Sequence, residues 1–180
     1  MKGKLSTVGM WVKMADWDSG SVFKKVAVGG TFDMLHKGHR KLLEVAFTAG
    51  SYVLIGLSSD SFVRKLHKPH KVGSYRARLE ALLKFLRAQG WVDRAKIIPI
   101  EDRFGVAASD PELEAIVVSV EKRDVAKEIN DRRVEIGLKP LNVLSVDMVM
   151  ASDNRPISTT RIRRGLINRE GKLIKRLKDD

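Results

Sequence analysis

The feature that most limits the fold of this chain is the alternation of short apolar runs with longer amphipathic segments, which begins at Lys24. Each apolar run ends in turn residues, as is typical of strands buried on both faces. This alternation predicts an α/β fold, with a parallel sheet flanked by helices on both faces. Pro99 cannot donate a hydrogen bond to a sheet, so we expect its strand near an edge. We expect strands at residues 26–28, 52–57, 97–100, 115–118 and 143–146, and helices at residues 37–49, 74–87 and 122–136.

The 180 residues are enough for one domain with a core of its own. We expect residues 1–22 to be an N-terminal extension that need not be ordered, residues 23–167 to form the domain, and residues 168–180 to be a basic tail or helix. The lack of cysteine excludes disulfides, thiolate metal sites and a thiol nucleophile. No apolar run approaches the ~18 residues that cross a bilayer, and the first residues lack a signal-like apolar core, so we expect a cytoplasmic protein without membrane contact.

The charge balance indicates an anionic partner, because 34 Lys and Arg against 22 Asp and Glu give a net charge of +12. A nucleic acid is one such partner, and residues 155–178 are rich in Lys and Arg with Glu170 as their acidic residue. However, aromatic residues make up 6% of the chain and no nucleic-acid-binding signature is recognisable. We therefore keep nucleic-acid binding as a remote alternative.

The first motif, residues 29–39, joins the first expected strand of the domain to its first helix. Ligands of open parallel sheets bind outside the carboxyl ends of the strands, which is where this segment must lie. Gly29 and Gly30 allow a sharp turn and a close approach of the backbone. The helix that begins near Lys37 offers unpaired N–H groups and a positive dipole end. The first motif therefore predicts a site for an anion.

Two histidines, His36 and His39, stand three residues apart at that helix start, so both can face one ligand, with Gly38 clearing space between them. Imidazole donates a directed hydrogen bond with tunable charge, which suits a phosphate that reacts. A helix cap with a core histidine, or a metal site, would be the alternatives. No Asp, Glu or His with suitable spacing completes a metal site, and the P-loop and G-x-G-x-x-G patterns are missing.

The second motif, residues 156–165, offers another anion site near the end of the chain. Ser158, Thr159 and Thr160 can cap a helix N-terminus and point hydroxyl groups outward. Arg161 adds a planar cation with five donors. Taken alone, the segment is better explained as a simple capped basic helix.

The two motifs together resemble a known superfamily. Gly-Thr-Phe-Asp followed by His-x-Gly-His, with a late Ile-Ser-Thr-Thr-x-Ile-Arg, is similar to the nucleotidyltransferases that include pantetheine-phosphate, FMN and nicotinamide-mononucleotide adenylyltransferases and glycerol- and choline-phosphate cytidylyltransferases. The resemblance spans residues 24–165 and implies a Rossmann-like nucleotidyltransferase fold. Residues 56–60, 74–79, 100–105 and 114–121 look most like the archaeal type of phosphopantetheine adenylyltransferase. The chain departs from that type at Val106 and Lys122, where such sequences often have Pro and Thr.

That resemblance implies transfer of the adenylyl group of ATP to 4′-phosphopantetheine, giving dephospho-coenzyme A and pyrophosphate, with Mg²⁺. The acceptor phosphate is already ionised, so the reaction needs no general base. The resemblance implies that His39 contacts the α-phosphate of ATP and that His36 contacts its β- and γ-phosphates. It also implies that Lys65 or Lys68 reaches both the α-phosphate and the acceptor. We expect His67 and His70 to be surface residues. The other nucleotide contacts implied are Gly29, Gly30, Thr31 and Phe32 of the first motif and Ser158, Thr159 and Arg161 of the second.

Other functions remain open from the sequence. The nearest alternative is the same chemistry with another acceptor or nucleotide, such as FMN with ATP or glycerol or choline phosphate with CTP. A nucleotide sensor without catalysis is another alternative. The sequence leaves monomer and homo-oligomer equally open.

Overall fold

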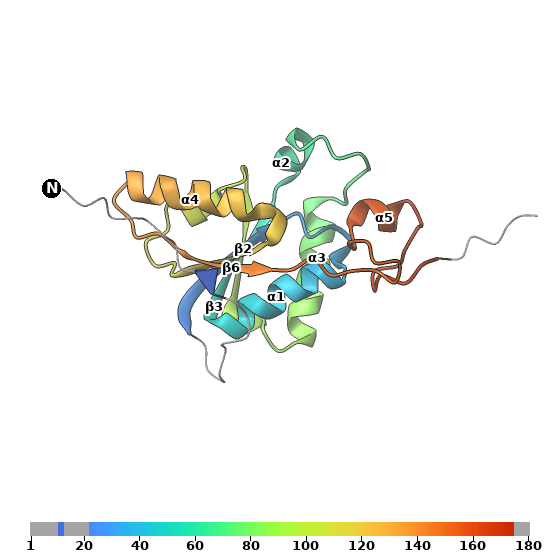
Figure 1. The fold of residues 1–180 in the computed structure, drawn as a ribbon, viewed down its shortest axis with the longest axis horizontal. Coiled ribbons are helices and arrows are strands. Elements are labelled where there is room, and N and C mark those ends of the chain that lie inside the picture. Colours follow the sequence, from blue (N-terminus) through green and yellow to red (C-terminus); the bar gives the residue numbers. More distant parts are fainter. Residues whose placement is uncertain (1–10, 13–21, 175–180) are drawn as a thin grey trace, which may run out of the picture.

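One parallel sheet forms the centre of the computed structural model, which describes residues 11–12 and 22–174. Every strand pairs in parallel with its neighbour, in the order β1-β6-β5-β2-β3-β4 (Figure 1). Most of the expected N-terminal extension, and residues 175–180 of the expected basic tail, lie outside the described residues. The strands are β1 (Trp11–Val12), β2 (Phe23–Gly30), β3 (Gly50–Ser58), β4 (Ala95–Ile100), β5 (Ala115–Ser119) and β6 (Asn142–Val146).

Helices cover both faces of the sheet, with α4 on one face and α1 and α3 on the other (Figure 1). The predicted α/β fold is thus confirmed, and the three long helices lie within one or two residues of their expected positions. Shorter helices, among them α2 after β3 and α5 in the second motif, complete the domain. The helices are α1 (Lys37–Ala49), α2 (Asp60–Lys65), α3 (Tyr75–Ala88), α4 (Arg123–Glu135) and α5 (Thr159–Arg163), with 3-10 turns η2 (Asp33–Leu35), η3 (Val92–Arg94), η4 (Gly105–Ala108) and η5 (Val120–Lys122).

An apolar core on each face of the sheet explains why the strand sequences are continuous apolar runs. On the face of α1 and α3, residues such as Leu43 and Leu82 pack against Ile55 of β3. On the face of α4, Ile129 packs against Ile116 of β5. Successive side chains of a strand point to opposite faces. Both sets must therefore be apolar when both faces are covered.

The order of the strands places the site. From β2 the chain passes through α1 to β3 and then to β4, whereas β5 pairs on the opposite side of β2. The order therefore reverses between β2 and β5, and ligands of such sheets bind at this point, outside the carboxyl ends. At one edge stands β4 with Pro99, which confirms that expectation. None of the described helices combines the length and apolarity required to cross a membrane.

Candidate active site

A strained turn between β2 and α1 carries the first motif. Phe32, Met34 and Leu35 have φ angles of 48°, 62° and 33°, in the left-handed region that residues other than glycine rarely adopt. Such strain costs on the order of 1–3 kcal/mol per residue and persists only where other contacts fix it. The Phe32 ring is 1% exposed, and the carboxylate of Asp33 accepts three hydrogen bonds. These contacts hold the turn in a geometry suited to a ligand.

The turn brings His36 and His39 together, as their three-residue spacing predicts. Their ring centroids lie 3.8 Å apart with an interplanar angle of 22°, so the imidazoles stack. Phe32 packs beside them, its ring 5.4 Å from that of His39. Both Nδ1 atoms are buried, and neither has a hydrogen-bond partner among the described residues. Buried polar atoms nearly always have partners in native proteins, so this pair is suited to a ligand that supplies them.

Both imidazoles are neutral near pH 7. Burial, reinforced by the charge of Arg40, lowers the pKa of His36 from 6.5 to about 4. Burial and the neighbouring His36 lower the pKa of His39 to about 3. The histidines can therefore supply directed hydrogen bonds to an anion, and positive charge must come from other side chains.

Gly38 clears the space beside these rings, as the sequence suggests. A Cβ atom at this position would lie 3.1 Å from Cε1 and 3.2 Å from Nδ1 of His36. These separations are tighter than ordinary van der Waals contact. Any larger residue at position 38 would therefore displace the His36 ring.

The second motif packs directly against the first. The Thr159 hydroxyl donates to the backbone oxygen of Asp33 at 3.1 Å. Arg163 donates two hydrogen bonds to the Asp33 carboxylate, from Nε at 2.8 Å and from Nη2 at 2.9 Å. Ser158 caps α5 by accepting from the backbone N–H of Arg161 at 3.4 Å. Segments more than 120 residues apart in the sequence thus form one site.

The side chain of Arg161, the predicted site arginine, is bound within the loop that precedes α5. It pairs with Asp153 and donates to the backbone oxygens of Arg155 and Pro156. Arg163 occupies the position beside the first motif instead. Residues two apart on a helix point to nearly opposite sides, whereas residues four apart share a face. Thr159 faces the first motif, and Arg163 lies four residues after it on the same helix. This four-residue spacing is the sequence signal that predicts Arg163, and not Arg161, beside the first motif.

Asp33 is the second residue that sequence reasoning passed over. Its side chain is 5% exposed and accepts a hydrogen bond from the backbone N–H of Gly73 at 3.1 Å, besides those from Arg163. Burial alone would raise the pKa of Asp33, but the hydrogen bonds from Arg163 and Gly73 lower it overall. A carboxylate that is ionised at neutral pH therefore joins three segments of the site.

The two candidate lysines differ in their surroundings, although both are exposed. Burial and His36 lower the pKa of His39, Asp33 opposes them, and the charge of Lys68 lowers it further. Lys65 acts on another group: hydrogen bonds from Ser61 and Ser59 lower the pKa of Glu101, and Lys65 lowers it further. Lys68 is therefore the lysine whose charge reaches the histidine pair.

The neighbouring histidines follow the prediction in one case only. His67 is exposed, as expected. The expectation for His70 was wrong, because this residue is half-buried and its Nδ1 atom lies 3.2 Å from the hydroxyl oxygen of Thr160. No pattern in the local sequence signals this contact, which joins residues 90 positions apart.

A buried arginine, Arg78, fixes the strand ends around the site. Its side chain is 2% exposed and donates to the backbone oxygens of Thr31 at 3.0 Å and Ser58 at 2.7 Å. It also pairs with Asp60, the first residue of α2, at 2.9 Å. One side chain thus links the ends of β2 and β3 to the segment that carries the lysines.

The glycines at the end of β2 lie where the backbone can meet a ligand. A Cβ atom at Gly30 would lie 3.4 Å from the ring of Phe32. Gly29 borders an apolar cavity of about 50 Å³, whose lining includes Gly56 and Phe104. The backbone here is therefore close to the strained turn on one side and to an apolar space on the other.

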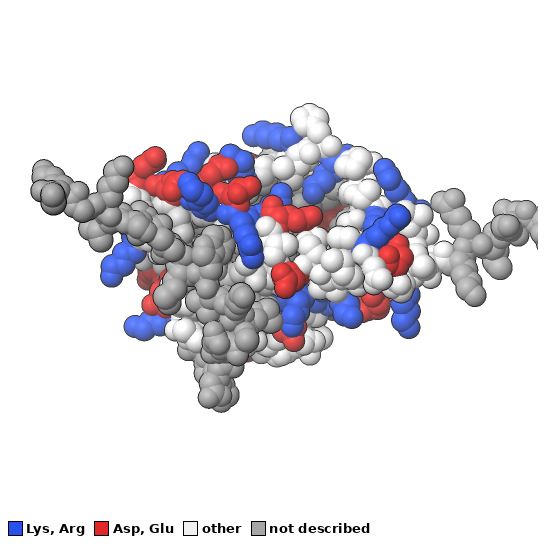
Figure 2. Space-filling view, in the orientation of Figure 1, with Lys and Arg blue, Asp and Glu red and all other residues white. Residues whose placement is uncertain are grey.

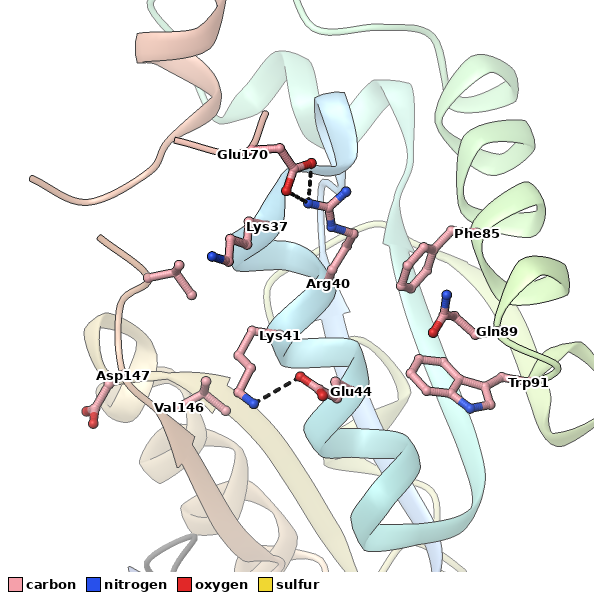
Figure 3. A pocket seen from close by; sticks show the side chains of 11 residues that line it. Lys37, Arg40, Lys41, Glu44, Phe85, Gln89, Trp91, Val146, Asp147 and Glu170 are labelled. Atoms are coloured by element: carbon pink, nitrogen blue, oxygen red, sulfur yellow. Dashed lines mark hydrogen bonds and ion pairs between the residues drawn. The ribbon is translucent and has the colours of Figure 1, made fainter. Parts of the chain in front are cut away.

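A larger groove, of about 900 Å³, lies over α1 (Figure 3). Lys37, Arg40 and Lys41 stand along it, with Trp91 among its apolar lining residues. Carboxylates compensate two of these cations, since Arg40 pairs with Glu170, and Lys41 with a glutamate one turn further along α1. Neither His36 nor His39 lines this groove. The groove therefore does not include the histidine pair, although Lys37 of the first motif lines it.

The surface charge is mixed on the face that Figure 2 shows, where Lys and Arg alternate with Asp and Glu. Within the described part of the chain, no group of three or more His, Asp or Glu side chains is arranged to hold a metal ion. Asp33 of the first motif already pairs with Arg163 of the second. A divalent cation here would thus depend on oxygen atoms supplied by a ligand, which Mg²⁺ commonly uses.

Comparison with known sequences finds a matching family and several relatives. A family model described as cytidylyltransferase-like matches residues 27–165. The phosphopantetheine adenylyltransferase of Methanopyrus kandleri is 45% identical over 141 residues, covering 78% of this chain and 89% of that protein. The enzyme of the same name from Methanothermobacter thermautotrophicus is 42% identical over 156 residues, covering 87% of this chain and 93% of that protein.

Solved structures share the fold. A protein of unknown function from Archaeoglobus fulgidus superposes with a TM-score of 0.62 at 33% identity, covering 68% of this chain and 89% of that one. A protein from Thermoplasma volcanium, described as acting in lipopolysaccharide core biosynthesis, gives a TM-score of 0.55 at 20% identity, covering 68% and 95%. The second likeness concerns the fold alone.

Proposed function

Because this chain belongs to the cytidylyltransferase-like family and, within it, to the phosphopantetheine adenylyltransferases, we propose that it transfers the adenylyl group of ATP to 4′-phosphopantetheine. The products are dephospho-coenzyme A and pyrophosphate. The observation that carries the chemistry is the pair of stacked imidazoles with buried, unpartnered Nδ1 atoms at the start of α1. The choice of acceptor rests on the relatives named phosphopantetheine adenylyltransferase, which this chain matches over most of their length.

The reaction is an in-line displacement at the α-phosphorus of ATP. A phosphate oxygen of the acceptor forms a bond to that phosphorus, and the bond to the bridging oxygen breaks as pyrophosphate leaves with the electron pair. The acceptor oxygen is ionised near pH 7, so the protein does not need to remove a proton. Its task is to align the reacting groups and to stabilise the charge that develops.

The neutral histidines supply hydrogen bonds to the phosphates. We assign His39 to the α-phosphate and His36 to the β/γ side, with the backbone from Gly29 to Thr31 and the buried Phe32 beside the nucleotide. A neutral imidazole keeps its donor while adding no charge that would hold pyrophosphate after the reaction. The strained turn keeps both rings in place before ATP arrives, and this pre-arrangement is what makes such donors effective.

Cations from two other segments complete the site. We assign Lys68 to the contact that spans the α-phosphate and the acceptor, because its charge reaches His39. Ser158, Thr159 and Arg163 of the second motif would bind the β- and γ-phosphates, with Arg161 holding the loop before α5. Mg²⁺ would be bound through the triphosphate and would neutralise part of its charge.

Pyrophosphate release tests the function directly. The purified protein is supplied with ATP or CTP and, in turn, with 4′-phosphopantetheine, FMN, glycerol 3-phosphate or choline phosphate. We expect release with ATP and 4′-phosphopantetheine. Release only with CTP, or only with FMN, would reject the proposed acceptor or nucleotide and leave the nucleotidyltransferase chemistry standing.

A histidine variant tests the roles within the site. We expect His39→Ala to lower kcat by ~10²–10³, with a smaller change in the KM for ATP, since the lost donor acts on charge that develops during the reaction. The control is His67→Ala, which removes an exposed imidazole nearby. Equal turnover of the two variants would contradict the assignment of His39.

A further inference from the structure

The segment at residues 66–73, which follows α2, is attached to the site at two points. Its last residue, Gly73, donates its backbone N–H to the carboxylate of Asp33 at 3.1 Å and accepts a hydrogen bond from Nε of Arg78 at 2.8 Å. Its other attachment is His70, whose Nδ1 atom lies 3.2 Å from the hydroxyl oxygen of Thr160 in α5. The segment contains no helix or strand, and Lys68 lies between α2 and these two attachments. The position of this lysine therefore depends on how the segment is held.

The two histidines of the segment are in different environments. His67 is exposed, and its Nδ1 atom contacts the backbone oxygen of Lys65 in the preceding helix at 2.8 Å. His70 is half-buried and reaches a distant helix. Burial lowers the pKa of His70; the charge of Asp33 opposes this, while the charges of Arg163, Lys68 and Arg164 lower it further. His70 thus faces charged groups of both motifs.

We propose that His70 is a positioning residue: its contact with Thr160 fastens segment 66–73 to α5 and so restricts the positions that Lys68 can take at the site. The consequence for turnover rests on the proposed function, because it requires that Lys68 act on the phosphates. An exposed lysine on an irregular segment has many conformations, and each attachment removes some of them. Small displacements of a reacting group can cost a large part of the rate, so the loss of one attachment should reduce turnover.

Substitutions that copy different atoms of the ring test this contact. His70→Ala removes it, whereas the side-chain amide of His70→Asn reaches the place of Nδ1 and that of His70→Gln reaches the place of Nε2. Thr160→Val removes the partner hydroxyl with little change in shape. The matched control is His67→Ala, three residues away on the same segment.

We expect His70→Ala to lower kcat by about tenfold with the KM for ATP changed by less than about threefold, and His67→Ala to leave both near wild type. His70→Asn should restore most of kcat, and His70→Gln should not. Thr160→Val should match His70→Ala, and the double variant should be no worse than either, since both remove one contact. Equal kcat for the Ala variants at 70 and 67, or losses that multiply in the double variant, would overturn the proposal.

A measurement without substrates separates this proposal from the proposed function. We expect amide hydrogen exchange in residues 66–73 to be faster in His70→Ala than in wild type, and unchanged in His67→Ala. Unchanged exchange in His70→Ala would overturn the proposal whatever the enzyme's substrates are. Failure of the proposed function would appear instead as a wild-type protein that releases no pyrophosphate with ATP and 4′-phosphopantetheine.

Discussion

Mild acid should destabilise this protein through its histidine pair. His36 is 6% exposed, and its pKa is about 4 in the folded protein against 6.5 for an ordinary histidine. Between these pH values the unfolded chain binds a proton that the folded chain does not. Stability contributed by the neutral ring is therefore present above pH 6.5 and is lost as the pH falls towards 4.

The size of the effect follows from the shift in pKa. One pKa unit corresponds to about 1.4 kcal/mol, so the complete loss from His36 is about 3 kcal/mol. At pH 5 the unfolded imidazole is almost fully protonated and the folded one is mostly neutral, so about 2 kcal/mol is already lost. His39 acts in the same direction, since its pKa is also lowered. The carboxylates contribute little at pH 5, because their ordinary values lie near 4.

Urea unfolding of the wild type and of His36→Gln, each at pH 7.5 and pH 5, measures this quantity. Glutamine is close in size and does not titrate, so the variant lacks the contribution from residue 36. We expect the free energy of unfolding of the wild type to fall by about 2 kcal/mol more than that of the variant between the two pH values. Equal losses in the two proteins would refute the conclusion that the His36 ring is buried and neutral.

Four further variants test other parts of the site. Lys68→Ala should lower kcat by about 10²-fold, whereas Lys65→Ala should change it by less than about threefold, in the same pyrophosphate assay. Gly38→Ala should lower kcat by about tenfold, because the added Cβ would lie 3.1 Å from Cε1 of His36; crystallography of the variant would show whether the ring has moved. Asp33→Asn should lower the free energy of unfolding at pH 7.5 by about 1–3 kcal/mol, since it weakens hydrogen bonds that join three segments; a change below about 0.5 kcal/mol would contradict that role.

The sheet and its long helices were predictable because burial on both faces leaves a strong signal. A strand such as β3 must be apolar at successive positions, and α3 must be apolar on the side that carries Leu82 and Leu86. The six-residue helix α2 was missed, because its sequence has no apolar periodicity and its start is fixed by the capping hydroxyl of Ser59 and by Arg78 bound to Asp60. Short elements of this kind are set by tertiary contacts.

Within the site, local spacing was informative and distant contacts were not. His36 and His39 are three apart at a helix start, and the structure stacks their rings. The assignment of Arg161 used the residue type without the helical geometry, which places Arg163 on the side of Thr159. The contact of His70 joins segments 90 residues apart, and no local rule relates such positions.

The net charge of +12 says little about how tightly the site binds a triphosphate, because several of its cations already have carboxylate partners. Arg163 pairs with Asp33, Arg161 with Asp153 and Arg78 with Asp60, while the two histidines are neutral. A phosphate group that binds Arg163 must share this arginine with the buried carboxylate of Asp33 or replace that carboxylate. Part of the favourable binding free energy is therefore offset. Among the described residues Lys68 makes no ion pair, so no carboxylate partner offsets its charge. Binding should therefore depend on a few placed donors and this lysine much more than on the overall excess of positive charge.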